Sequence, residues 1–251
     1  MIFIYSKRFE KGEYSNDPAS DEERFYSVAR MIKDQENIVE ARPATKEEIL
    51  EAHTEQHYRW VKQDKYLFEM ASLAAGGAIQ TAELGYEGKP AFAAIRPPGH
   101  HASGGSCWGF CFFNNMSVAI LNLMRDKKIE SAFILDFDLH TGDGNINILS
   151  SYEDISIINP DGPTRKSYLN EIKDRFSSEK NYDILGVSAG FDQYEHDWGR
   201  LLTREDFTRI GELAAEFSDK KCKGRRFALL EGGYNFEELG KNILAFCNGF
   251  E

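Results

Sequence analysis

An apolar run that ends in alternating polar residues constrains the fold of this chain more than any other feature. Residues 131–135 (Ser-Ala-Phe-Ile-Leu) are typical of a strand buried on both faces of a parallel sheet. Asp136, Asp138 and His140 follow at every second position, before a glycine-rich turn at 141–144. Because side chains two residues apart on a strand share one face, these three are expected to point the same way. Open α/β sheets place their sites at this carboxyl edge.

Three polar side chains on one buried face cost free energy unless something compensates them. A divalent metal ion is the simplest compensation. The pattern at 136–140 therefore predicts a metal site at the carboxyl end of this strand.

Apolar runs rich in β-forming residues alternate with longer helical segments along the whole chain. This alternation predicts an α/β fold, a three-layer open parallel sheet with helices on both faces. No repeat, low-complexity tract or linker divides the 251 residues, so residues 1–251 are expected to form a single domain. The expected strands are Ile2–Tyr5, Ala91–Ile95, Ala132–Asp136, Ile155–Ile158, Ile184–Ser188 and Phe227–Leu230. The expected helices are Asp21–Gln35, Lys46–Ala52, Phe68–Leu84, Asn114–Arg125, Ser167–Phe176, Arg204–Ser218 and Glu237–Phe246.

Charge and composition exclude several classes of function. A formal net charge of −11 argues against nucleic-acid binding, which needs a basic surface. No apolar run is long enough to cross a bilayer, and the N-terminus is typical of a first strand rather than a signal peptide. The four cysteines form neither a CxxC pair nor a disulfide framework, which predicts a reduced, cytoplasmic protein with packed thiols.

Four segments with unusual polar content follow four of the expected strands. Since the carboxyl ends of parallel strands meet at one edge, the four segments are expected to converge. They are Arg96–Ala102, Asp136–Gly144, Ser188–Asp192 and Leu230–Asn235.

Taken together, these segments resemble the zinc-dependent histone deacetylase and acetylpolyamine amidohydrolase family. The motifs RPPGHHA, GFCFFNN, DFDLHTGDG, SAGFD and EGGYN stand in the family's order, and residues 42–53 and 73–77 are also similar to it. SAGFD and EGGYN are closer to the class II and bacterial or archaeal branch than to class I. The resemblance implies the arginase–deacetylase fold, here in a compact form.

The resemblance also implies a ligand set for one zinc ion per chain: Asp138, His140 and Asp192. Two carboxylates and one imidazole leave positions free for water and substrate, as a catalytic zinc site requires. Iron stays an alternative metal. The resemblance further implies a potassium ion beside the zinc. Backbone carbonyls would supply part of its ligands, so no side-chain pattern in the sequence marks this site.

By resemblance, the tandem histidines and a tyrosine carry the proton transfers and the oxyanion. His101 matches the residue that shuttles the proton, and His100 acts mainly through its charge. Asp136 and Asp143 match the carboxylates that orient these two rings. Tyr234 matches the tyrosine that donates a hydrogen bond to the tetrahedral oxyanion.

Three further residues are expected to shape the substrate site. Phe110 matches an aromatic wall of the channel for the substrate's alkyl chain, with ordinary core packing as the alternative reading. Gly109 precedes it. Gly232 belongs to the Gly-Gly pair that lets the tyrosine loop approach the site.

The chain departs from the family pattern in several places. Thr141 stands where most members carry a second histidine, and Trp108 replaces a smaller residue, which is expected to reshape the pocket mouth. The chain is trimmed before residue 73 and between 159 and 167, where members often carry rim loops and the second aromatic wall. No residue is identified for that wall, so a shallower, more open site is expected. His53 is expected to be structural and His57 to lie on the surface.

The resemblance implies a zinc-dependent deacetylase that hydrolyses an N-acetylated amine, such as acetyl-lysine, an acetylpolyamine or a related small amide. The alternative is a metal-binding or interaction protein of the same fold with little or no turnover. Arginase-like hydrolysis is disfavoured by the RPPGHHA and EGGYN segments. The expected partner is the acetylated substrate, with further copies of the chain as an open alternative and neither nucleic acid nor a membrane.

Overall fold

The computed structural model describes residues 1–12 and 14–251, and within them one seven-stranded sheet organises the chain. Every strand pair is parallel, and the strand order is β2-β1-β3-β7-β6-β4-β5. This confirms the α/β class and the open parallel sheet. The strands are β1 Ile2–Tyr5, β2 Ile38–Glu40, β3 Ala91–Ala93, β4 Ala132–Asp136, β5 Ile155–Ile158, β6 Ile184–Ala189 and β7 Arg226–Leu230.

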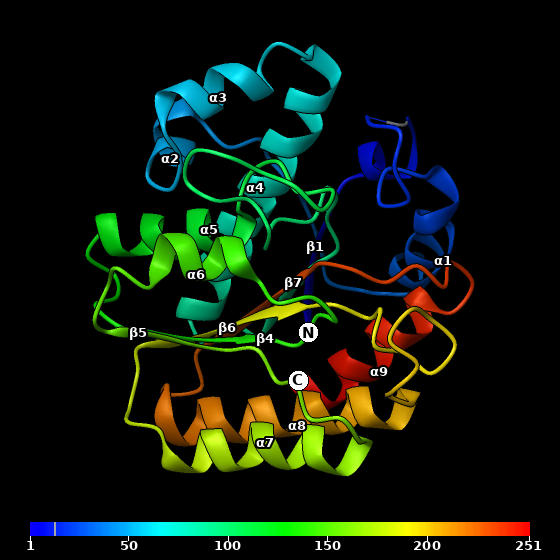
Figure 1. Cartoon of the computed structure of the whole chain (residues 1–251), viewed down its shortest axis with the longest axis vertical. Helices are drawn as coiled ribbons and strands as arrows, with labels where there is room; N and C mark the ends of the chain where they lie inside the picture. The colour runs from blue at the N-terminus through cyan, green and yellow to red at the C-terminus, as the bar shows by residue number, and fades with distance from the viewer. Residues whose placement is uncertain (13) are drawn as a thin grey trace.

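Helices cover both faces of the sheet and complete three layers (Figure 1). In the view of Figure 1, α4, α5 and α6 lie above the sheet, and α7, α8 and α9 lie below it. The helices are η1 Lys7–Glu10, α1 Glu22–Lys33, α2 Lys46–Leu50, α3 Glu55–Val61, α4 Lys65–Tyr86, α5 Asn115–Arg125, α6 Asp143–Leu149, α7 Arg165–Ser178, α8 Arg204–Lys221 and α9 Leu239–Phe250. Among the described helices, none is both long and apolar enough to cross a membrane. The four cysteines are free.

The central strands are apolar because both of their faces are covered. Every residue of β4, β6 and β7 is buried. The predicted bounds of β1, β4 and β5 are confirmed residue for residue, whereas β3 ends at Ala93, two residues early. The sequence prediction missed β2, since this edge strand exposes all three residues and carries no buried apolar pattern.

The register of the strands brings the four polar segments to one edge of the sheet. Asp136 pairs with Ser188, which pairs with Leu229, which in turn pairs with Ala93. The loops that follow β3, β4, β6 and β7 therefore start side by side. This confirms the expected convergence.

Two histidines of the N-terminal helical region are buried. The ring of His53 accepts a hydrogen bond from the backbone N–H of Asn114 at 2.8 Å. His57 was expected on the surface, and that prediction is wrong: the residue is only 3% exposed. Its Nε2 atom lies 2.7 Å from the carbonyl oxygen of Phe112, and its ring stacks on Trp60. The sequence prediction did not include helix α3, which contains His57 and packs it against the loop before α5.

Burial of His53 predicts a pH-dependent stability. Burial, with a smaller contribution from His57, lowers the pKa of His53 to about 3. Below pH 6.5 His53 is protonated in the unfolded chain but stays neutral in the folded chain. The free energy of unfolding therefore falls as the pH falls from 6.5 towards 3. Between pH 7 and pH 5 this single group costs about 2 kcal/mol.

Urea unfolding of the wild-type chain and of His53→Gln at these two pH values measures the effect. The glutamine keeps an acceptor for Asn114 but cannot take up the proton. The wild type is expected to lose about 2 kcal/mol more than the variant. Equal losses in the two proteins would contradict the assignment.

Candidate metal centre and catalytic residues

Three candidate metal ligands meet at the carboxyl edge of β4 and β6. Asp138 and His140 lie in the loop between β4 and α6, and Asp192 follows β6. One ligand atom from each lies within 4.8 Å of the other two. The Nδ1 atom of His140 is 3.3 Å from an oxygen of each carboxylate. Phe137 lies between the polar positions and packs in the core instead, as strand alternation predicts.

The charge and hydrogen bonding of this group fit a divalent cation. Both carboxylates are buried, and the Oδ2 atom of Asp192 has no hydrogen-bond partner among the described residues. Burial and the neighbouring Asp138 raise the pKa of Asp192 to about 7. The nearby carboxylates of Asp138 and Asp192 raise the pKa of His140 to about 10. The site therefore stabilises positive charge, and a cation between these donors would satisfy the unpartnered oxygen.

Gly232 leaves the space that the two carboxylates occupy. Its backbone N–H donates to Oδ2 of Asp138 at 2.8 Å. A Cβ atom at position 232 would lie 2.6 Å from that oxygen and 2.8 Å from Oδ2 of Asp192. Only glycine permits so close an approach of this loop to both carboxylates.

His100 lies beside the ligands and is paired with Asp136, the last residue of β4. Its Nδ1 atom is 3.2 Å from Oδ2 of Asp136, and the same oxygen accepts a hydrogen bond from Asn145. Burial opposes a charge on this ring, but the carboxylates of Asp138 and Asp136 outweigh it and raise the pKa of His100 well above 6.5. The surroundings of His100 thus favour the protonated ring next to the ligand group.

His101 has the opposite electrostatic character. Its Nδ1 atom lies 2.6 Å from Oδ1 of Asp143, the first residue of α6. Burial and the neighbouring His100 lower the pKa of His101 to about 4, against the pull of Asp143. Trp108 donates its indole N–H to the other oxygen of Asp143 and lies over the His101 ring, with 4.0 Å between ring centres. The ring is therefore neutral at pH 7 and fixed from two sides.

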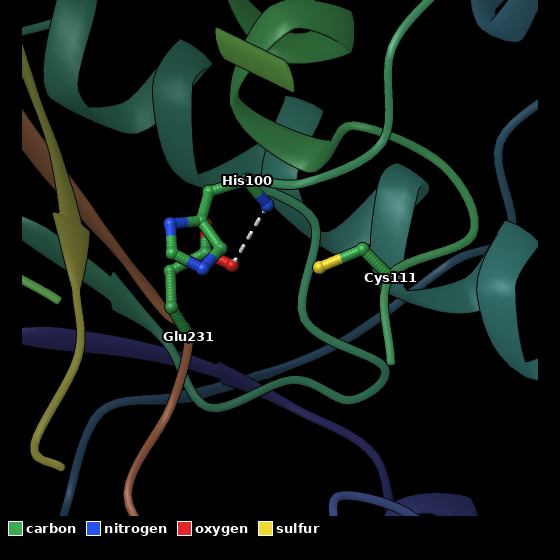
Figure 2. Close-up of side chains that lie close together, drawn as sticks. All are labelled: His100, Cys111 and Glu231. Carbon is green, nitrogen blue, oxygen red and sulfur yellow. Dashed lines mark hydrogen bonds between the residues drawn. The ribbon is translucent and has the colours of Figure 1, made fainter. Parts of the chain in front are cut away.

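Sequence reasoning did not single out Glu231, which braces the histidine loop. This buried carboxylate accepts hydrogen bonds from the backbone N–H groups of Gly99 and His100 at 2.7 and 3.2 Å, and from the hydroxyl of Ser188. Figure 2 shows the bond to His100 and the thiol of Cys111 close by. His100, Cys111 and Glu231 could together hold a metal. However, the His100 ring is paired with Asp136 and the Glu231 carboxylate with backbone, so we assign this group to holding the loop.

A second missed residue, Arg24 of α1, holds the loop that follows β7. Its guanidinium donates to the carbonyl oxygens of Gly233 and Glu231 at 2.9 and 2.5 Å. The Arg24 side chain is fully buried. The two carbonyl groups that it contacts lie more than 200 positions later in the sequence. The local signal for this contact was an arginine next to the apolar positions of an amphipathic helix.

A pocket of about 120 Å³ opens above the ligand group. Phe110 and Gly109 line it from one loop, and Tyr234 lines it from the loop after β7. The backbone of Gly109 has a φ of 58°, and a Cβ atom there would lie 2.3 Å from the His101 ring. Phe110 stands edge-on to Tyr234, with 6.0 Å between ring centres. The predicted catalytic, substrate-binding and ligand residues thus either line this pocket or contact a residue that lines it.

The pocket also has an aromatic wall that sequence reasoning did not identify. Trp198 lines it and stacks on Tyr234. Its position six residues after Asp192, in a loop at the same sheet edge, was the signal that could have found it. Trp108 lines the mouth, as its position beside Gly109 led us to expect.

Comparison with known proteins identifies the family. A family model for the histone deacetylase domain matches residues 19–168. The chain belongs to the histone deacetylase family. The crystal structure of the HDA15 HD domain superposes with a TM-score of 0.84 at 21% identity, over 98% of this chain and 87% of that one. The histone deacetylase fold expected from the sequence is therefore confirmed.

Archaeal relatives match almost the whole length of this histone deacetylase family member. A probable deacetylase of Archaeoglobus fulgidus is 30% identical over 99% of this chain and 86% of its own. One from Methanothermobacter thermautotrophicus is 27% identical over 100% of this chain and 91% of its own. The first alignment is 312 positions long and so exceeds the 251 residues here, which shows that the relative carries segments this chain lacks.

Substitution of Gly232 tests the packing of the ligand group. Gly232→Ala places a methyl group against both carboxylates, so we expect the affinity for Zn²⁺ to fall at least about tenfold. The matched control is Gly104→Ala, whose Cβ would approach other atoms no closer than 3.5 Å. Competition with a chromophoric chelator measures both affinities. Equal affinities in the two variants would contradict the geometry described.

Proposed function

We propose that this chain is a zinc-dependent deacetylase that hydrolyses the amide bond of an N-acetylated amine. The observation that carries the proposal is one pocket lined by two of the three ligand donors, by a carboxylate-paired histidine and by a tyrosine, with the third donor, Asp192, grouped with the other two. Each is a component that amide hydrolysis needs. Family membership and the probable deacetylases among the relatives support the same reaction class.

Asp138, His140 and Asp192 are the residues that would hold the metal. Two carboxylates and one imidazole suit zinc and leave free positions. Such an ion, when bound, polarises the acetyl carbonyl and acidifies water. The unpartnered oxygen of Asp192 supports this assignment. The potassium ion implied by the resemblance stays a prediction.

His101 is the group that takes and returns the proton. Since its pKa is lowered to about 4, its Nε2 atom is free to accept a proton from the attacking water at neutral pH. Asp143 accepts the Nδ1–H bond and stabilises the imidazolium that forms. The imidazolium then donates its proton to the leaving amine. The raised pKa of His100 favours its protonated form, and a positive charge there would favour charge development on the acetyl oxygen.

Tyr234 is the donor for the oxyanion. Burial raises the pKa of its phenol well above the usual value, so the hydroxyl keeps its proton and remains a hydrogen-bond donor. A preorganised donor of this kind contributes roughly 3 kcal/mol to transition-state stabilisation.

The substrate class follows from the small, aromatic-lined pocket. A volume of about 120 Å³ accommodates an acetyl group and a narrow linker rather than a bulky amide. Acetyl-lysine peptides, acetylputrescine and acetylspermidine carry the acetyl group on an unbranched alkylamine. They are the first substrates to examine, with a small aromatic acetamide as the bulkier comparison.

Acetate release by the zinc-loaded chain from these four substrates tests the proposal. Tyr234→Phe is expected to lower kcat by roughly a hundredfold to a thousandfold and to retain the bound zinc. Tyr26→Phe, which changes an exposed tyrosine, is the matched control and should keep full activity. Turnover is expected to be lost in Asp192→Ala. A zinc-loaded wild type that releases no acetate from any substrate would favour the binding-protein alternative.

A further inference from the structure

Trp198 lies flat against the tyrosine of the pocket. The ring centres of Trp198 and Tyr234 are 3.9 Å apart and their planes are inclined by 14°. The indole also stands edge-on to His140 at 6.3 Å. It is 48% exposed, so it forms the outer wall of the pocket rather than part of the core.

The residue before it ties the two loops together. Asp197 is buried, and its Oδ2 atom accepts hydrogen bonds from the backbone N–H groups of Tyr234 and Asn235 at 2.6 and 2.7 Å. Its Oδ1 atom accepts the N–H of Trp198 at 2.7 Å. One carboxylate thus holds the backbone of both stacked residues. Three charge-assisted hydrogen bonds to a single buried group fix the relative position of the loops.

Tyr234 depends on these contacts because the backbone before it has few conformational restraints of its own. Two glycines precede it, and Gly233 has a φ of 125°, which side chains disfavour. Among the described residues, none forms a hydrogen bond with the Tyr234 hydroxyl. The ring is held by the stack on Trp198, by the edge of Phe110 and by the guanidinium of Arg24 at 5.4 Å.

We propose that Trp198, anchored by Asp197, is the positioning residue that fixes the Tyr234 hydroxyl over the pocket. The inference rests on the proposed function and deepens it. Trp198 takes the place of the missing second aromatic wall, and its contribution acts through Tyr234. It lies in the loop that begins with the ligand Asp192, so the same segment carries a metal ligand and orients the oxyanion donor.

Kinetics of Trp198 variants provide the first test. Trp198→Ala is expected to lower kcat roughly tenfold to a hundredfold, because a displacement of about 1 Å has effects of this size, with a smaller change in KM. Trp198→Phe retains a stacking ring and should recover most of that loss. Trp60→Ala, which removes an equally exposed tryptophan from α3, is the matched control and should leave kcat unchanged.

A double-mutant cycle separates positioning from a general effect on the fold. If Trp198 acts through Tyr234, Trp198→Ala should change kcat less than about threefold in the Tyr234→Phe background, since coupled residues are not additive. An equal loss in both backgrounds would overturn the proposal. Asp197→Asn is the second variant. An amide has one acceptor oxygen, so it releases at least one of the three N–H groups and should also lower kcat about tenfold.

A readout that needs no turnover completes the test. The ¹⁹F resonance of 3-fluorotyrosine at position 234 should be shifted by the ring current of the stacked indole, and Trp198→Ala should remove the shift. Bound zinc should stay at one per chain in both proteins. An unchanged resonance would overturn the positioning role. A wild type inactive on every substrate would refute the proposed function alone, and the resonance would then decide the inference by itself.

Discussion

Buried carboxylates at the ends of β4, β6 and β7 are the constraint on which the rest of the structure depends. Asp136, Asp138, Asp192 and Glu231 are each no more than 4% exposed. Ionised groups in such surroundings cost several kcal/mol each unless they are paired. The chain pairs Asp136 with His100 and Glu231 with backbone N–H groups. Asp138 and Asp192 accept backbone hydrogen bonds and share the imidazole of His140, but the Oδ2 atom of Asp192 keeps no hydrogen-bond partner among the described residues. We propose that a divalent cation offsets the remaining negative charge.

The same constraint explains the loops around the pocket. At position 232 the backbone passes so close to the carboxylates of Asp138 and Asp192 that a Cβ atom would not fit, which is the physical reason for the glycine there. The two glycines give the backbone of the tyrosine loop few local restraints of its own. Arg24 donates hydrogen bonds to this loop, Asp197 accepts hydrogen bonds from it, and Trp198 stacks on its tyrosine. Rigidity that the local backbone lacks is thus supplied by contacts from distant segments.

The sequence predicted the parts of this arrangement that local pattern determines. Buried strands such as β4 are apolar up to their last residue, and the polar residues at and after their carboxyl ends gather at one edge. Helices α3 and α6 and strand β2 were missed because they are short and carry mixed or exposed residues. The sequence did not predict the roles of Trp198, Glu231 and Arg24, because their contacts join segments that lie 36 to more than 200 residues apart. The surface assignment of His57 failed for the same reason, since α3 and the loop before α5 meet only in the folded chain.

We propose that a divalent cation completes the ligand group, and the thermal unfolding midpoint of the chain tests this most directly. Zn²⁺ would be added to the chelator-treated wild-type chain and to Asp192→Asn. A cation that binds the folded chain at a hundred times its dissociation constant contributes about 2.7 kcal/mol, or roughly 5 °C or more. We expect this rise in the wild type and little change in the variant. A folded wild-type chain whose midpoint does not respond to Zn²⁺ would contradict it.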